Sequence, residues 1–90
     1  MKLPVNYTKL RYSRKRIVRE EYIKLQNGLC YYCNKPLKEK AAKDKPVNIA
    51  LFPKGFFQWP IHLHHNHDTG MTIGAVHNYC NAVLCQYHGE

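Results

Sequence analysis

The stretch IHLHHNHDTGMTIGAVHNYCNAVLCQYHGE, residues 61–90, decides the fold of this chain. It contains all six histidines and two of the four cysteines, and it contains no lysine or arginine. Ligand side chains at this density and at short repeating spacings favour metal chemistry. The chain has 90 residues, which is one small domain, and a core of that size is marginal without a metal or covalent staple.

Local patterns in this stretch predict a strand, a turn, a second strand and a helix. Residues 61–65 alternate apolar and polar side chains, which is typical of a strand. Residues 67–70 are turn formers, and residues 71–76 form a second short strand that Gly74 interrupts. From residue 77 to about residue 87, ligand and apolar side chains recur at steps of three and four, which indicates a helix.

Basic residues are confined to the part of the chain before this stretch. Residues 1–29 contain eight basic residues (lysine or arginine) and two acidic residues. Residues 30–60 contain six basic and two acidic residues, and residues 61–90 contain no basic and two acidic residues. The net charge is +8 with histidine neutral. A basic front attracts phosphate backbones, so we expect nucleic acid as a partner. A solvated face or a membrane-surface patch are the alternatives that charge alone leaves open.

No segment has the composition of a membrane span or an export signal. No apolar run approaches the roughly 18 residues that cross a bilayer, and no apolar signal-peptide region follows the N-terminal residues. We therefore expect a cytoplasmic protein without a membrane partner. In such a reducing compartment a Cys-x2-Cys motif indicates a zinc or redox site, and a secreted disulfide-bonded protein is the least favoured class.

The sequence predicts a basic amphipathic helix at residues 13–27. Ser13 is a candidate N-cap, and Gly28 is a natural C′ residue. The predicted apolar face consists of Ile17, Val18, Tyr22 and Leu25. Before the helix, residues 1–12 show no clear period and predict a loosely packed arm that lies along DNA or frays. The basic side chains that we expect to bind DNA are Arg11, Arg14, Lys15, Arg16 and Arg19.

Cys30 and Cys33 form a Cys-x2-Cys turn within the sequence LCYYCNKPL, residues 29–37. Two thiolates on a tight turn can bind one tetrahedral zinc ion. A thioredoxin-type redox site is the other interpretation, but no strand–helix–strand pattern surrounds the motif. A second ligand pair decides between the two.

The sequence is least informative between residues 38 and 60. The charged segment 38–45 is either a short helix or a solvated loop, and residues 47–52 are compatible with a strand. The aromatic residues that follow either cover the core or form a wedge or stacking surface for DNA. We favour core cover, because the chain has few other large apolar groups. These residues are Phe56, Phe57 and Trp59.

Taken in order, the ligand motifs resemble those of the HNH, or ββα-metal (His-Me finger), endonucleases, and within them the phage recombination endonuclease VII family. The motifs are Cys30-x2-Cys33, then His64-His65-Asn66-His67 at a hairpin, then His77-x2-Cys80-Asn81. The resemblance spans roughly residues 25–84. It implies an α+β fold: a small zinc-stapled ββα-metal domain at residues 29–90, preceded by a basic arm and helix at residues 1–28, in one compact domain.

The resemblance implies a metal-dependent DNA endonuclease that leaves 5′-phosphate and 3′-hydroxyl ends. His65 would be the general base, and His64 and Asn81 would hold one catalytic divalent ion. His67 would support these ligands or contact phosphate. A structural zinc ion would be bound by Cys30, Cys33, His77 and Cys80.

The two adjacent histidines raise a geometric requirement. Neighbouring residues of a regular strand point to opposite faces, yet His64 and His65 must reach the same phosphate. We therefore expect the first strand to end or bulge at this pair.

The chain departs from the family pattern at three positions. His64 replaces an aspartate. We expect Mg2+ or Mn2+ as the catalytic cation, and activity relatively better with Mn2+, Co2+, Ni2+ or Zn2+ than in an aspartate-bearing relative, because imidazole suits these softer ions. His77 replaces a cysteine, which zinc accepts. The segment before Gly74 lacks an arginine that would contact phosphate.

Some assignments stay open. Cys85 is an alternative fourth zinc ligand, although Cys80 and Cys85 would lie about 140° apart around a helix. His88 is a candidate extra metal ligand or a frayed terminal residue, and His62 is expected to support the site. The alternative function is a non-catalytic zinc-stapled nucleic-acid-binding module. We expect duplex or branched DNA as the partner and a homodimer as the assembly. The resemblance implies a bacterial or phage origin, and a phage protein would act in the host cytoplasm.

Overall fold

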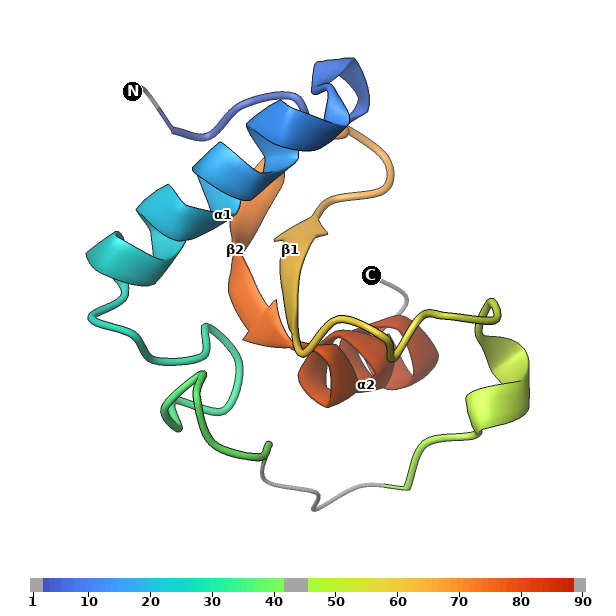
Figure 1. The fold of residues 1–90 in the computed structure, drawn as a ribbon. Helices are drawn as coiled ribbons and strands as arrows, with labels where there is room; N and C mark the ends of the chain where they lie inside the picture. The colour runs from blue at the N-terminus through green and yellow to red at the C-terminus, as the bar shows by residue number, and fades with distance from the viewer. Residues whose placement is uncertain (1–2, 42–45, 89–90) are drawn as a thin grey trace.

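A computed structural model describes residues 3–41 and 46–88, and these residues confirm the predicted α+β class (Figure 1). Within them, two α-helices and a two-stranded antiparallel sheet form the scaffold. The elements follow the order η1 (Tyr7–Lys9), α1 (Tyr12–Leu25), η2 (Ile49–Leu51), β1 (Ile61–His65), β2 (Thr72–His77) and α2 (Asn78–His88). None of the described helices is both long enough and apolar enough to cross a bilayer.

The hairpin of β1 and β2 has a bulge at its two adjacent histidines. Ile61 pairs with His77 and His64 pairs with Gly74, but His65 pairs with Thr72, so the register shifts between His64 and His65. The bulge expected from the sequence is therefore confirmed. Asn66 closes the turn, because its side-chain oxygen accepts from the N–H groups two and three residues later, at 2.8 and 3.0 Å.

Helix α1 lies across the hairpin and ends in a Schellman motif (Figure 1). The Asn27 N–H donates to the Lys24 carbonyl and the Gly28 N–H donates to the Ile23 carbonyl, at 3.1 and 2.8 Å. Asn27, with φ of 55°, thus occupies the C′ position predicted for Gly28. The predicted N-cap is also wrong: the N-cap is Arg11, without a side-chain cap bond, in place of Ser13.

The apolar face of α1 is narrower than its pattern suggests. Val18 and Tyr22 are buried in the core, whereas Ile17 and Leu25 are exposed. The Tyr22 hydroxyl forms a buried 2.8 Å hydrogen bond with the Thr72 hydroxyl on β2. Val18 and Tyr22 are therefore the buried contacts of the helix with the sheet, and most of its other side chains are exposed or half-buried.

The N-terminal arm is packed against the hairpin, so the prediction of a loosely packed arm is wrong from Val5 onward. The Thr72 N–H donates to the Val5 carbonyl at 2.9 Å, and the Tyr7 N–H donates to the Gly70 carbonyl at 2.7 Å. Asn6 forms a bridge with Met71. These bonds extend the edge of β2 and place η1 beside the hairpin turn.

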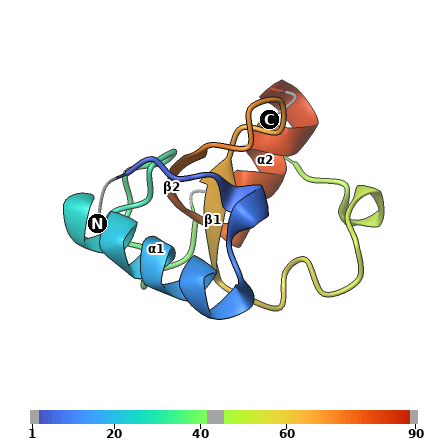
Figure 2. The same ribbon diagram turned by 90° about the horizontal axis from the view of Figure 1, so that it is seen from above.

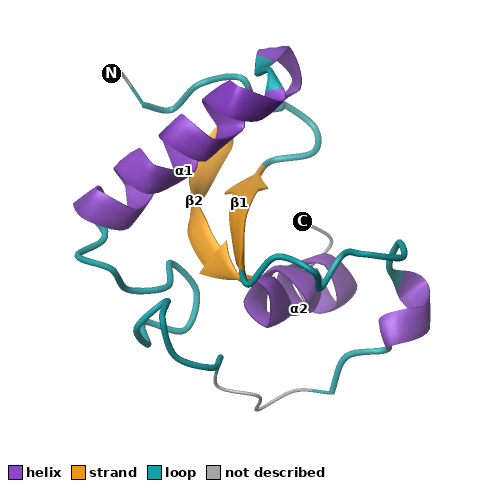
Figure 3. Cartoon of the chain, in the orientation of Figure 1, coloured by secondary structure: helices purple, strands orange, loops and turns teal. Residues whose placement is uncertain are grey.

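The connection between α1 and β1 is mostly loop (Figure 3), and it runs out past α2 (Figure 2). The strand considered for residues 47–52 is absent there; the Asn48 side chain accepts from the Ala50 N–H at 3.1 Å and stabilises η2 in its place. Residues 42–45 of the charged segment lie outside the described residues. The last part of the connection, just before β1, is attached to α2, because the Asn78 side chain donates to the carbonyls of Phe57 and Trp59.

The core lies between α1, the hairpin, the Cys-x2-Cys turn and α2. Its buried side chains are Val18, Tyr22, Cys30, Leu37, Leu63, Ala75, Val76, Cys80 and Leu84. Phe56 and Phe57 do not belong to it, and Trp59 is 54% exposed. The interpretation of these aromatic residues as core cover is therefore wrong.

Candidate functional site

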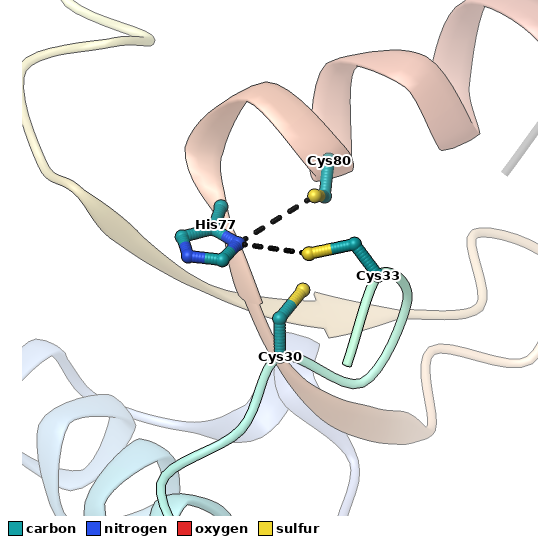
Figure 4. Close-up of side chains that lie close together, drawn as sticks. All are labelled: Cys30, Cys33, His77 and Cys80. Carbon is teal, nitrogen blue, oxygen red and sulfur yellow. Dashed lines mark hydrogen bonds between the residues drawn. The ribbon is translucent and has the colours of Figure 1, made fainter. Parts of the chain in front are cut away.

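Two thiols from a turn, one thiol from a helix and one imidazole from a strand meet at a single point (Figure 4). One ligand atom from each of Cys30, Cys33, His77 and Cys80 lies within 4.8 Å of the others. His77 ends β2 and Cys80 lies in the first turn of α2, so the strand-to-helix junction supplies one pair. The turn after α1 supplies the other pair.

The Cys-x2-Cys turn has the backbone bonds that a tight turn requires. The Asn34 N–H donates to the Cys30 carbonyl at 3.0 Å, and the Cys30 N–H donates to the Lys35 carbonyl at 2.9 Å. Asn34 adopts a positive φ of 61°, which asparagine tolerates better than most residues. The turn therefore holds both thiols on one side, toward His77 and Cys80.

The spacing of the donors fits a zinc ion. The Nδ1 atom of His77 lies 3.4 Å from Cys33 Sγ and 3.6 Å from Cys80 Sγ. Zn–S and Zn–N bonds of ordinary length at a tetrahedral angle give an S···N separation of about 3.6 Å. The two separations match that edge, so these residues could hold a structural metal such as zinc.

The tautomer of His77 also fits metal binding. Its Nε2 atom lies 3.0 Å from the Pro36 carbonyl oxygen, which can only accept, so Nε2 carries the proton. The neutral ring then presents its Nδ1 lone pair to the sulfur atoms. An outer hydrogen bond of this kind is the usual partner of a metal-bound histidine.

The thiols of the site are electrostatically prepared for an ion. A hydrogen bond from Cys80 lowers the pKa of Cys30 to about 4, and the same interaction raises the pKa of Cys80. The Cys80 thiol thus donates its proton in a hydrogen bond to the Cys30 sulfur. A bound cation would displace that proton. Cys85, the alternative ligand, is not in the cluster, and the four cysteines form no disulfide.

A second polar cluster joins β1 to α2. His62 and His64 lie two residues apart on β1 and both contact the carboxamide of Asn81. His64 Nδ1 lies 3.1 Å from Asn81 Oδ1, and Asn81 Nδ2 lies 3.0 Å from His62 Nδ1. The carboxamide of Asn81 therefore presents its oxygen to His64 and its nitrogen to His62, and His64 is only 2% exposed.

His65 lies on the far side of the bulge from His64, toward the arm. Its ring stacks on Tyr7 and lies 4.9 Å from the ring of His67. Burial lowers the pKa of His65, and a hydrogen bond with the Leu63 backbone acts in the opposite direction. The charges of His67, His64 and Lys15 lower the pKa further. Burial and the neighbouring charges therefore both favour the neutral form of the ring, and the stacking on Tyr7 fixes its orientation.

A groove of about 780 Å³ runs between α1 and these histidines. Lys15, Arg16 and Arg19 line it from α1. His62, His65, His67 and Asn81 line it from the hairpin and α2. We call this surface the histidine groove. Of the predicted site residues outside the zinc set, His64, Arg11 and Arg14 do not line it, and the side chain of His88 lies outside the described residues.

Sequence reasoning missed one residue of this site, Tyr7. Tyr7 carries no motif, and only its contact with a turn some sixty residues away places it on His65. His62 was expected to support the site, and it does so by a direct bond to Asn81. Its position two residues before His64, on the same face of a strand, was the available signal.

Comparison of the chain with protein-family models, with curated proteins and with solved structures gives no match. The function therefore has to be argued from the geometry of the two clusters and the groove.

Proposed function

We propose that this chain is a metal-dependent HNH endonuclease with a ββα-metal domain, which hydrolyses phosphodiester bonds of DNA. The observation that carries the proposal is the placement of His65. The ring stands at the bulge that ends β1, keeps a backbone hydrogen bond at Leu63, and faces a groove with three cationic side chains on its opposite wall. A neutral imidazole beside a phosphate-binding wall is what a general base for phosphodiester hydrolysis requires.

In this mechanism the backbone of the scissile strand lies along Lys15, Arg16 and Arg19, which neutralise its phosphates. His65 accepts a proton from water at the ring nitrogen that is not bonded to Leu63. The oxygen of that water attacks phosphorus in line, and the bond to the 3′ oxygen breaks. The products carry 5′-phosphate and 3′-hydroxyl ends. His67, exposed beside His65, contacts the same phosphate.

His64 and Asn81 would hold the catalytic cation, because they place an imidazole nitrogen and an amide oxygen 3.1 Å apart. When bound, a divalent cation there supplies charge stabilisation to the phosphate and to the leaving oxygen. The amide oxygen suits Mg2+ or Mn2+, and the imidazole favours the softer Mn2+, Co2+, Ni2+ or Zn2+. His62 keeps the Asn81 carboxamide in place through its 3.0 Å contact.

The Cys30–Cys33–His77–Cys80 cluster would bind zinc as a structural ion. It joins the turn after α1 to the junction of β2 and α2, which carries Asn81 into the site. Reduced thiols at this position suit a cytoplasmic location, bacterial or in the host of a phage. A homodimer remains our proposal for paired cuts, since each protomer has one such site.

Nicking of a supercoiled plasmid tests the function. We expect the zinc-loaded wild type to nick DNA when Mg2+, Mn2+, Co2+ or Ni2+ is added, and His65→Ala to lose at least two orders of magnitude in rate, the usual contribution of a general base. Asp68→Asn, an exposed position in the same turn, is the matched control and should keep full activity. Inert wild type on plasmid, junction and single-stranded DNA, with zinc and DNA both bound, would leave the non-catalytic binding module as the function.

A further inference from the structure

The histidine groove has an aromatic wall that the proposed reaction does not use. Phe56 and Trp59 line the groove next to His62 and outside the core. Trp59 is the only tryptophan of the chain and is 54% exposed. We call these two side chains the aromatic ledge. A flat apolar surface in a polar groove indicates a partner with a flat apolar face.

Contacts within the protein hold the Phe56 ring and the backbone of Trp59 in place. Phe56 packs edge-on against His62, with ring centroids 4.8 Å apart and planes at 78°, and it packs on Phe52 at 4.7 Å. The backbone of the ledge is held to α2, because Asn78 Nδ2 donates to the Trp59 carbonyl at 3.0 Å. The Asn78 N–H donates to the Pro60 carbonyl at 2.9 Å. Binding therefore loses little conformational entropy in this segment.

Positive charge lies across the groove from the ledge. Arg16 and Arg19 line the groove from α1. Arg19 lines the same groove as Phe56 and as His62, the ring on which Phe56 packs, so a guanidinium and the ledge face one space. A partner that fills the groove must join anionic groups to a flat aromatic face. A nucleotide of a nucleic-acid strand has both, whereas an acidic peptide or a lipid surface lacks the repeated flat face.

We propose that the aromatic ledge binds one unstacked nucleobase of the strand whose phosphate lies at His65. Bases inside a continuous duplex already stack on both faces, so they cannot offer one to Trp59. The substrate class is therefore a strand with an unpaired base beside the scissile phosphate. The position of that phosphate rests on the proposed nuclease function, while the ledge itself is tested by binding alone.

Emission from Trp59 reports stacking directly, because no other tryptophan contributes. The full-length zinc-loaded His65→Ala protein is titrated with a single-stranded DNA of about 12 nucleotides, a usual site size, and with a blunt-ended duplex of two complementary strands of the same length. We expect the single strand to quench the emission at least about twofold and the duplex to bind without quenching, because only an unstacked base can stack on indole. Equal binding of both probes with unchanged emission overturns the ledge.

Affinity for the single strand provides the second measurement. We expect Trp59→Ala to weaken it about 5- to 100-fold, the usual cost of losing one base-stacking aromatic residue, and Trp59→Phe to keep most of it. Leu51→Ala is the control, since Leu51 is 65% exposed in the same connection but does not line the groove. An equal loss of affinity for the duplex and the single strand in Trp59→Ala would also overturn the ledge.

The two proposals fail in different ways. If the wild type nicks DNA with added metal but no strand changes the Trp59 emission, the nuclease proposal stands and the ledge proposal fails. Quenching of Trp59 by the single strand in a protein that cleaves no DNA keeps the ledge as a base-binding site and removes the nuclease.

Discussion

The phenol ring of Tyr7 lies flat on the imidazole ring of His65, with centroids 3.8 Å apart and planes inclined by only 6°. The Tyr7 N–H donates to the Gly70 carbonyl at 2.7 Å, so the hairpin turn itself holds the ring in place. The Lys15 ammonium lies 4.3 Å from the centroid of the same Tyr7 ring. Burial and positive charge on this side therefore both disfavour protonation of His65.

The pH dependence of cleavage should reflect this environment. The pKa of His65 is lowered from 6.5, so the ring stays neutral at acidic pH values where an ordinary histidine is charged. We expect kcat/KM to hold down to pH 6.5 and to fall only below it. Tyr7→Ala should move the acid limb upward, because the ring becomes hydrated, whereas Tyr7→Phe should leave it in place. A wild-type midpoint at or above 6.5, or a midpoint that Tyr7→Ala does not move, would contradict this role.

Removal of the structural metal should unfold the chain. Structural zinc sites contribute about 10 kcal/mol or more to the folding of small domains, which is comparable to the whole stability of a domain of this size. We expect a strong chelator to abolish the cooperative thermal transition, and zinc to restore it. Cys33→Ser should lose zinc and fold poorly, whereas Cys85→Ser should bind zinc with a Tm close to that of the wild type. Equal zinc content in the two variants would argue against the Cys3His site.

The arginines of α1 should differ in their effect on DNA binding. Arg16 and Arg19 line the histidine groove, whereas Arg14 lies on the exposed surface of the same helix outside it. Loss of one phosphate contact reduces the slope of log Kd against log salt by about one. We expect that change for Arg16→Ala and Arg19→Ala and a smaller one for Arg14→Ala. The measurement is a salt titration of anisotropy, and equal slopes for all three variants would place DNA elsewhere on α1.

Gly74 should be required for the close packing of the C-terminal end of α1 against β2. A Cβ atom at this position would lie 2.8 Å from Gln26 Oε1 and 3.1 Å from the Tyr31 side chain. Gln26 cannot turn away freely, because its carboxamide bonds to both the N–H and the carbonyl of Ala75, at 2.8 and 2.9 Å. We expect Gly74→Ala to cost about 1–3 kcal/mol in the free energy of unfolding. Denaturant unfolding of the zinc-loaded protein measures it.

A double-mutant cycle separates the clash from other effects of Gly74→Ala. In a Gln26→Ala background the added methyl group meets one neighbour fewer, so its cost should shrink. An unchanged cost in that background would assign the effect to the backbone of β2 instead of to Gln26.

Elements that follow from local pattern were predictable from the sequence. Strand β1 begins at Ile61 and ends at His65 as the alternation predicts, and α2 is shifted by one residue from its predicted start at His77. The bulge could be predicted because two adjacent histidines in a regular strand would point apart. The grouping of Cys30 and Cys33 with His77 and Cys80 was what the resemblance to the HNH motifs implied, and the residues alone left Cys85 open as an alternative ligand.

Features that depend on long-range contacts could not be predicted. The start of α1 at Tyr12 follows the arm, which bonds to the hairpin through Val5 and Tyr7, and no local signal encodes that contact. The segment before β1 has strand-forming residues, but the Asn48 cap and the bonds of Asn78 set its path. The burial of His64 beside Asn81 likewise depends on how α2 packs against β1, and no local signal in the sequence predicted it.

The choice of catalytic cation should depend on His64. Its Nδ1 atom lies 3.1 Å from Asn81 Oδ1, so a cation at this position would meet one nitrogen and one oxygen donor. Mg2+ prefers oxygen ligands, while Mn2+, Co2+ and Ni2+ accept imidazole. We expect the wild type to nick faster with these softer ions than with Mg2+, and His64→Asp to reverse that ratio by about tenfold or more, since about 1.4 kcal/mol of differential binding is enough. Zinc content confirms that the variant folds, and Asp68→Asn serves as the control because Asp68 is exposed in the hairpin turn and takes no part in the contact between His64 and Asn81. A His64→Asp protein that folds, binds DNA and gains no Mg2+ preference would show that the cation binds elsewhere in the groove.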